Sequence, residues 1–176
     1  MRSNAIRTGL AVAALFAVGA CNGTTTGPAS AGTVPAGAET IGWSVGPCFG
    51  FCPVYSVAVT AQGGVTFDGQ RHTAVLGGKT REGGADAYRA IATALAPYRP
   101  TTGATTRTQC EQQISDSSAY VVTWTRADGT VTTLQHDGGC RSARNTALVD
   151  ALKALPQRLG IAAWTQQVTR PGESRG

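Results

Sequence analysis

Four of the five cysteines form the chemically most distinctive set in this chain of 176 residues. Cys48 and Cys52 lie four positions apart in the stretch CFGFCPVYSV, whereas Cys110 and Cys140 stand alone. Cysteines of this kind can act as redox thiols, hold zinc or form disulfides. The compartment decides between these chemistries, because disulfides persist in oxidising environments and are rare in the cytosol.

The amino-terminal residues indicate the compartment. Arg2 and Arg7 accompany an apolar stretch over residues 9–19, and no acidic residue interrupts it. That stretch is shorter than the about 20 apolar residues that a membrane span needs, but it has the length typical of a secretory signal. It ends in VGAC, where Cys21 follows three small residues. This ending resembles the lipobox of bacterial lipoproteins.

The lipoprotein resemblance implies a particular maturation. Residues 1–20 would be a signal peptide, and Cys21 would become the first residue and carry acyl chains, palmitate among them. Two or more chains hold a protein stably on a membrane. Because Asn22 follows rather than the aspartate associated with inner-membrane retention, the resemblance implies an outer-membrane lipoprotein facing the periplasm. Residues 21–40, rich in Gly, Thr, Ala and Pro, read as the lipidated cysteine and a disordered tether.

An oxidising compartment favours two disulfides among the remaining four cysteines. We expect Cys48 to pair with Cys52, since they are close in sequence around the flexible Gly50. We expect Cys110 to pair with Cys140, since these two bracket a predicted hairpin. The redox alternative is weaker, because thioredoxin-type sites use Cys-x-x-Cys at a helix start. A zinc site is also weaker, because Cys110 and Cys140 are isolated.

His136 is the residue on which a hydrolytic alternative depends. It stands in the stretch HDGG, where the adjacent Asp137 could suggest part of a catalytic site. Gly-x-Ser-x-Gly occurs twice, as GWSVG at residues 42–46 and as GESRG at residues 172–176. The first lies in a predicted strand and the second in the predicted tail, and neither precedes a predicted helix as a nucleophile elbow does. We therefore keep an envelope hydrolase using His136 as the alternative, and expect no catalytic residue, metal or cofactor in the leading interpretation. His72 lies in a predicted strand with nothing distinctive near it.

Charge and composition bound the possible partners. The chain has 15 basic and 10 acidic residues, and removal of residues 1–20 takes away two arginines. The remaining basic residues are scattered singly, without the dense stripe expected of a nucleic-acid-binding protein. We therefore expect no nucleic-acid partner. Residues 41–167 suit a single domain, and residues 168–176 read as a flexible tail.

The hydrophobic pattern predicts the elements of that domain. Strands are expected over residues 41–45, 53–60, 65–67, 71–76, 120–126 and 130–135 from alternation and turn residues. Helical spacing predicts helices over residues 86–95 and around the leucines 148, 152 and 155. Residues 77–84 read as a mobile loop and residues 99–109 as a further loop. The order indicates an α+β fold, a mostly antiparallel sheet of hairpins with two helices packed on one face.

The stretch CFGFCPVYSVAVTAQGGVTFDG resembles a family of bacterial envelope proteins known only as a domain of unknown function. The motif is Cys-x-Gly-x-Cys-Pro-x-Tyr, followed by a strand, a glycine turn and a short strand. It is carried here by Cys48, Gly50, Cys52, Pro53 and Tyr55, with Gly69 closing the second strand. The resemblance extends over residues 41–164 and implies an architecture like the one above, but no activity.

These observations favour a non-enzymatic, lipid-anchored module that binds or scaffolds an envelope protein or glycan. A Cys48–Cys52 bond would hold Phe49 and Phe51 at a constrained tip. These two rings are the expected binding surface if they are exposed. The membrane, reached through the lipid on Cys21, is the other expected partner.

Overall fold

The computed structural model describes residues 38–175, and all of them belong to one compact unit. The predicted signal peptide, the lipidated Cys21 and most of the tether lie outside the described residues. Within residues 38–175, no helix is long and apolar enough to cross a membrane.

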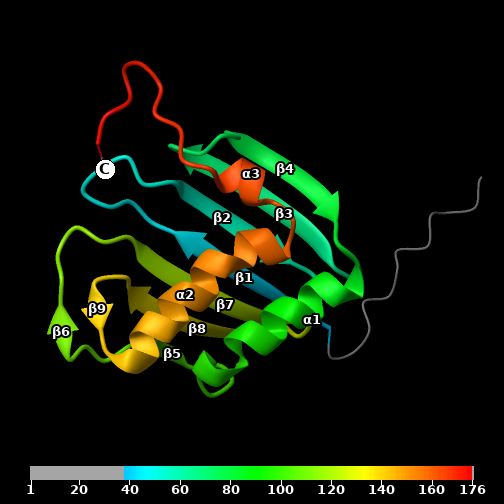
Figure 1. The fold of residues 1–176 in the computed structure, drawn as a ribbon. Helices are drawn as coiled ribbons and strands as arrows, with labels where there is room; N and C mark the ends of the chain where they lie inside the picture. Colours follow the sequence, from blue (N-terminus) through cyan, green and yellow to red (C-terminus); the bar gives the residue numbers. More distant parts are fainter. Residues whose placement is uncertain (1–37, 176) are drawn as a thin grey trace, which may run out of the picture. The chain divides into compact units, whose positions relative to one another are not determined.

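A seven-stranded sheet forms the centre of the domain, in the order β4-β3-β2-β1-β7-β8-β5 (Figure 1). All neighbouring pairs are antiparallel except β5 and β8, which are parallel. The strands are β1 Glu39–Val45, β2 Val54–Val59, β3 Gly64–Arg71, β4 Gly77–Glu82, β5 Thr105–Arg107, β7 Ala119–Arg126 and β8 Val131–Asp137. A separate two-stranded sheet joins β6 Gln112–Gln113 to β9 Cys140–Arg141.

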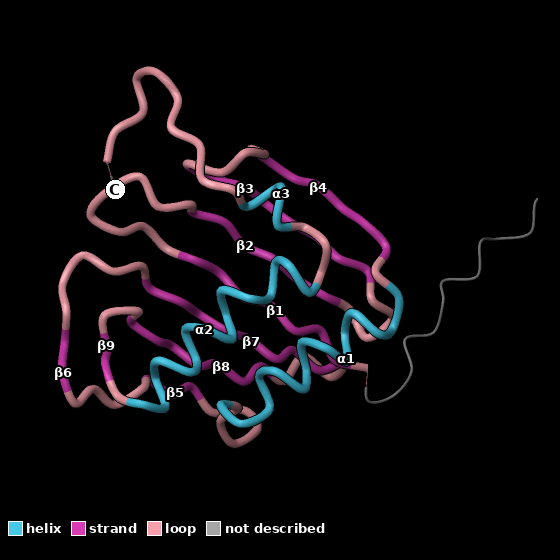
Figure 2. Tube along the Cα trace, viewed as in Figure 1, coloured by secondary structure: helices cyan, strands magenta, loops and turns pink. Residues whose placement is uncertain are grey.

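Two long helices lie side by side across one face of this sheet (Figures 1 and 2). They are α1, Gly84–Leu95, continued by the 3₁₀ turn η1, Ala96–Tyr98, and α2, Ala143–Arg158. A short helix, α3, Ala162–Thr165, follows α2. The α+β architecture with helices on one face of a mostly antiparallel sheet is therefore confirmed.

The core lies between the sheet and the helices because each strand alternates between a buried and a more exposed face. On β1, Ile41, Trp43 and Val45 are buried, and the intervening residues are partly exposed. On α2, Leu148, Leu152 and Leu155 are buried at helical spacing against the same core. Every second strand residue and every third or fourth residue of the helix therefore face each other, and together they form one continuous apolar layer.

The hairpin between β2 and β3 depends on one glycine. Gly63 has φ +89°, and a Cβ atom there would lie 1.8 Å from the carbonyl oxygen of Gly84. Glycine alone can therefore occupy this turn, where the chain touches the start of α1. The amide of Gly83 donates to the carbonyl of Gly63, which fastens the helix start to the hairpin.

Two sequence expectations are wrong at the edges of the sheet. Residues 72–76 form no strand; β4 lies instead at residues 77–82, which were expected to be a mobile loop. Most residues of β4 are exposed, and so they lack the apolar alternation that would reveal a strand. Strand β5 likewise lies within residues 99–109, where a loop was expected, and all three of its residues are exposed.

Candidate functional site

Two disulfides fasten the loops at one end of the sheet. Cys48 pairs with Cys52, with Cα atoms 5.7 Å apart, and Cys110 pairs with Cys140, with Cα atoms 4.9 Å apart. The predicted connectivity is therefore confirmed. We call residues 46–53 the stapled loop. Its start is also held to β7, because the amide of Gly46 donates to the carbonyl of Ala119 at 2.8 Å.

The two phenylalanines of the stapled loop differ in environment. Phe49 is 68% exposed, the largest exposed fraction of the exposed large apolar side chains in the described residues. Phe51 is only partly exposed, and its ring packs edge-on against the imidazole of His72, with centroids 5.2 Å apart. The guanidinium of Arg175 lies 5.9 Å from the centroid of the same ring. Phe51 thus packs the stapled loop against the domain, whereas Phe49 is exposed to solvent.

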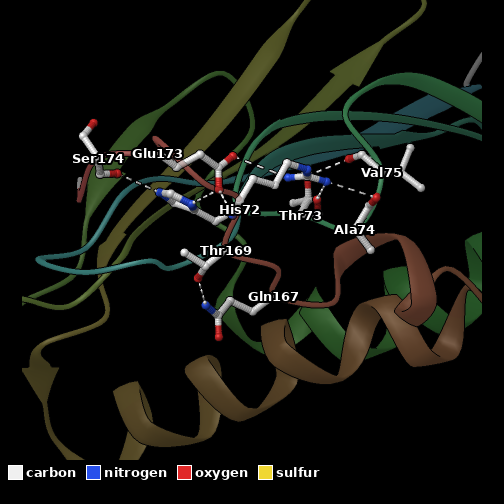
Figure 3. Close-up of polar contacts among 9 residues, drawn as sticks. His72, Thr73, Ala74, Val75, Gln167, Thr169, Glu173 and Ser174 are labelled. Atoms are coloured by element: carbon white, nitrogen blue, oxygen red, sulfur yellow. Dashed lines mark hydrogen bonds and ion pairs between the residues drawn. The ribbon is translucent and has the colours of Figure 1, made fainter.

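The carboxyl-terminal segment contacts His72, the residue that packs against Phe51 of the stapled loop. Figure 3 shows His72 between Glu173 and Ser174. His72 is 1% exposed and has φ +55°, a left-handed conformation that is uncommon outside glycine. Its Nδ1 lies 3.1 Å from Oε2 of Glu173, and its Nε2 lies 3.1 Å from the carbonyl oxygen of Ser174. Both ring nitrogens therefore face acceptor oxygens of the carboxyl-terminal segment.

Arg170 extends this contact toward the residues before β4. Its Nη2 donates to the carbonyl oxygens of Thr73 at 2.7 Å and Ala74 at 3.3 Å. Its backbone amide donates to Oε2 of Glu173 at 2.8 Å. That amide, followed by the His72 and Arg170 side chains, holds the pKa of the Glu173 carboxyl below its usual value.

Residues 168–175 therefore make specific contacts, although the sequence predicts a flexible tail. Besides the Arg170 and Glu173 contacts, the amide of Val168 donates to the carbonyl of His72 at 2.9 Å. The freedom of this segment in solution stays a prediction. No local pattern marks these contacts, because His72 and Glu173 are separated by 101 positions.

A hollow of about 430 Å³ opens between the sheet and the carboxyl-terminal half of α2, and we call it the tyrosine groove. Val45 on β1 pairs with Tyr55 on β2 and with Tyr120 on β7, so these three side chains form one row beneath the helix. The helix side includes Leu152 and Pro156, with Lys153 beside them. The stapled loop contributes Cys52 and Pro53 to the rim.

The tyrosine hydroxyls remain protonated at physiological pH. Burial raises the pKa of Tyr55 to about 12, and burial also raises the pKa of Tyr120. Each hydroxyl can therefore donate or accept a hydrogen bond without carrying charge. The groove combines apolar walls with a few polar groups, the composition common to ligand sites.

His136 continues the same row across the sheet but is enclosed. It pairs with Tyr120 in the register of β7 and β8, and its ring stacks on the tyrosine ring at 6.2 Å. Nδ1 of His136 lies 2.8 Å from Oγ1 of Thr108, while Nε2 is buried without a hydrogen-bond partner in residues 38–175. Burial lowers the pKa of His136, and Asp137 opposes this shift.

This environment makes His136 a poor general base. Taking up a proton would place an imidazolium in a buried site, and burial disfavours that charge. In a hydrolytic triad, a carboxylate holds the second ring nitrogen of the histidine. Within the described part of the chain, nothing occupies that position on Nε2. Residues 38–175 also contain no group of three or more His, Cys, Asp or Glu side chains that could hold a metal ion.

The fold and the two disulfides define a class of protein, a disulfide-stapled α+β domain with a helix-covered antiparallel sheet. The particular family follows from comparison with known families. Residues 39–158 match the family model of a domain of unknown function, DUF6438. The chain belongs to that family, and the match includes both disulfides and most of the tyrosine groove. The chain matches no curated protein and no solved structure.

Proposed function

We propose that this protein is a lipid-anchored module of the bacterial cell envelope that binds another envelope protein with its stapled loop. One observation carries the binding proposal. Phe49 is 68% exposed on a loop closed by a disulfide, next to a groove lined by Tyr55 and Tyr120. A rigid, exposed aromatic ring beside a partly apolar hollow is typical of an interaction surface.

The chemistry of the site favours a protein segment as the partner. A phenylalanine on a constrained loop can insert into a partner with little loss of conformational entropy, because the disulfide already orders its backbone. The groove beside it offers tyrosine hydroxyls and the ammonium group of Lys153, which is exposed. These groups suit the backbone carbonyls and carboxylates of an extended segment. A glycan that stacks on Phe49 is the alternative outcome of the tests below.

The anchor is supported by the sequence and can be tested separately. We expect Cys21→Ala to block lipidation and signal cleavage, so that the precursor accumulates. Globomycin, which inhibits the lipoprotein signal peptidase, should have the same effect on the unaltered chain. Normal processing in the variant or in the presence of globomycin would contradict the anchor proposal.

Binding is tested by crosslinking and pull-down of the lipidated protein from its own envelope. Phe49→Ser removes the exposed ring, and Val131→Ser is the matched control. Val131 is 43% exposed and lies at the start of β8, whose far end faces Ala119 next to the stapled loop. We expect a defined protein partner to be lost with Phe49→Ser and retained with Val131→Ser. Equal recovery from both variants would contradict the proposed surface.

An envelope hydrolase using His136 is the second candidate, favoured by a single contact. Oγ1 of Thr108 lies 2.8 Å from Nδ1 of His136, the distance expected between a nucleophile and its base. The burial of His136 and its lowered pKa weigh against this candidate. Turnover of an ester, peptide or glycan panel, abolished by both His136→Ala and Thr108→Ala in folded protein, would establish it. Absence of turnover would leave the binding proposal as the better account.

A further inference from the structure

A second hollow, of about 520 Å³, lies at the opposite end of α2 from the tyrosine groove. It is bounded by the chain after α1, by β5 with the residues that follow it, and by the first turns of α2. Three arginines line it, and we call it the arginine hollow. The arginines are Arg99, Arg107 and Arg144.

Only one of these arginines is neutralised by a carboxylate. Arg99 donates to both carboxylate oxygens of Glu39, at 2.6 and 2.8 Å. Arg107 donates to the side-chain amide oxygen of Gln135 at 3.2 Å, which is a neutral partner. Neither Arg107 nor Arg144 forms an ion pair with a carboxylate of residues 38–175. Glu111 is the one acidic residue in the lining.

Arg144 is held in place by neutral groups as well. Its guanidinium lies 5.3 Å from the centroid of the Tyr98 ring, and its Nη2 donates to the carbonyl oxygen of Pro97. These contacts hold the guanidinium at the rim without cancelling its charge. With Glu111 as the one carboxylate among the lining residues, Arg107 and Arg144 still leave a net positive charge at the hollow, which attracts an anion.

The rest of the lining sets the form of that anion. Leu134 from β8, Leu148 from α2, Pro100 and the ring of Tyr98 provide apolar surface. The hydroxyl of Thr108 and the amide of Asn145 add polar groups. Guanidinium groups bind carboxylate and phosphate with two parallel hydrogen bonds, which an ammonium group cannot do. A hollow of this volume falls within the range of small-molecule sites.

From these observations we propose that the arginine hollow binds a small organic anion, a carboxylate or phosphate group carried on an apolar, planar body. The anionic group would lie between Arg107 and Arg144, and the apolar body would lie against Leu134, Leu148 and Tyr98. A concave hollow with apolar walls suits a compact molecule better than a flat membrane surface. This proposal does not depend on the proposed function, because its residues lie outside the stapled loop and the tyrosine groove.

The test is an NMR titration of the full chain in detergent with phenyl phosphate and benzoate. Benzamide, inorganic phosphate and vesicles with and without phosphatidylglycerol are titrated in parallel. We expect saturable binding of phenyl phosphate with a Kd of about 1 mM or tighter, the range of fragment-sized ligands. Resonances of Thr108 and Leu148 should shift, and benzamide and inorganic phosphate should bind at least about tenfold more weakly.

Arg107→Gln with Arg144→Gln should weaken phenyl phosphate binding by about tenfold or more, because each change removes a charge-assisted hydrogen bond. The control is Arg126→Gln, since Arg126 is exposed, donates to the neutral Thr102 and lies outside the hollow. Arg107→Lys with Arg144→Lys keeps both positive charges and controls for a folding defect. This variant should bind phenyl phosphate with an affinity between those of the unaltered chain and the double Gln variant. The proposal would be overturned if benzamide bound as tightly as phenyl phosphate, or if Arg126→Gln weakened phenyl phosphate binding as much as the double variant. It would also be overturned if the chain bound anionic vesicles but not phenyl phosphate.

Discussion

Breaking the Cys110–Cys140 bond should destabilise this domain more than breaking the Cys48–Cys52 bond. The two bonds span sequence separations of 30 and 4 residues. On the chain-entropy model, the longer loop contributes about 3.7 kcal/mol to the free energy of unfolding and the shorter loop about 2 kcal/mol. The longer bond also joins the loop after β5 to β9, segments that are distant in the sequence.

Cys110→Ser and Cys52→Ser are the variants to compare. Cys110 is exposed, so its substitution removes the bond with little loss of packing, whereas Cys140 is 1% exposed and would lose packing too. Cys52 is partly exposed. The expected difference of about 1.7 kcal/mol corresponds to a gap of about 7 °C between the two melting temperatures.

Thermal unfolding followed by circular dichroism measures this gap, and urea unfolding at constant temperature gives the free energies directly. Both variants should be compared with the oxidised parent chain under the same conditions. Equal melting shifts, or a larger shift for Cys52→Ser, would refute the reasoning from loop length. A shift for neither variant would show that the bonds do not constrain the unfolded chain as the model assumes.

Three further predictions follow from the same structure. Mass spectrometry of protein taken from the periplasm and alkylated without reductant should show two intact disulfides; free thiols would instead favour the redox or zinc alternatives. Because burial lowers the pKa of His136, its contribution to stability should be complete above pH about 6.5, where the unfolded histidine is also neutral, and should be lost as pH falls. Unfolding midpoints measured between pH 7.5 and 5 should therefore fall, with a smaller slope in His136→Gln, and an unchanged slope in that variant would contradict the assignment. Glu173→Ala should speed hydrogen exchange of the Val168 amide, which donates to His72, and unchanged exchange would show that Glu173 does not hold this segment.

The sequence predicted the elements that bury an apolar face. Strands β1, β2, β7 and β8 alternate clearly, and the leucines of α2 recur at helical spacing, so their apolar periodicity reflects their burial. The disulfide pairing was predictable for a different reason. The lipobox resemblance pointed to an oxidising compartment, and Cys110 and Cys140 bracket a hairpin that brings them together.

Features that depend on distant or exposed residues were not predictable. Strands β4 and β5 are edge strands of exposed residues, held by backbone pairing that leaves no hydrophobic pattern. The His72 and Glu173 contact joins residues 101 positions apart, and no local motif marks either one. Phe49 and Phe51 look equivalent in the sequence, but only the folded positions of His72 and Arg175 distinguish the packed ring from the exposed one.

We expect Phe49 to contact a partner protein in the envelope. The most direct measurement replaces Phe49 with a photo-crosslinking phenylalanine in the full lipidated chain and irradiates whole cells. The same replacement at Val131, the exposed apolar residue on β8, is the control. We expect one discrete crosslinked protein from position 49 and none of that size from position 131. The same products from both positions, or no product from position 49, would contradict it.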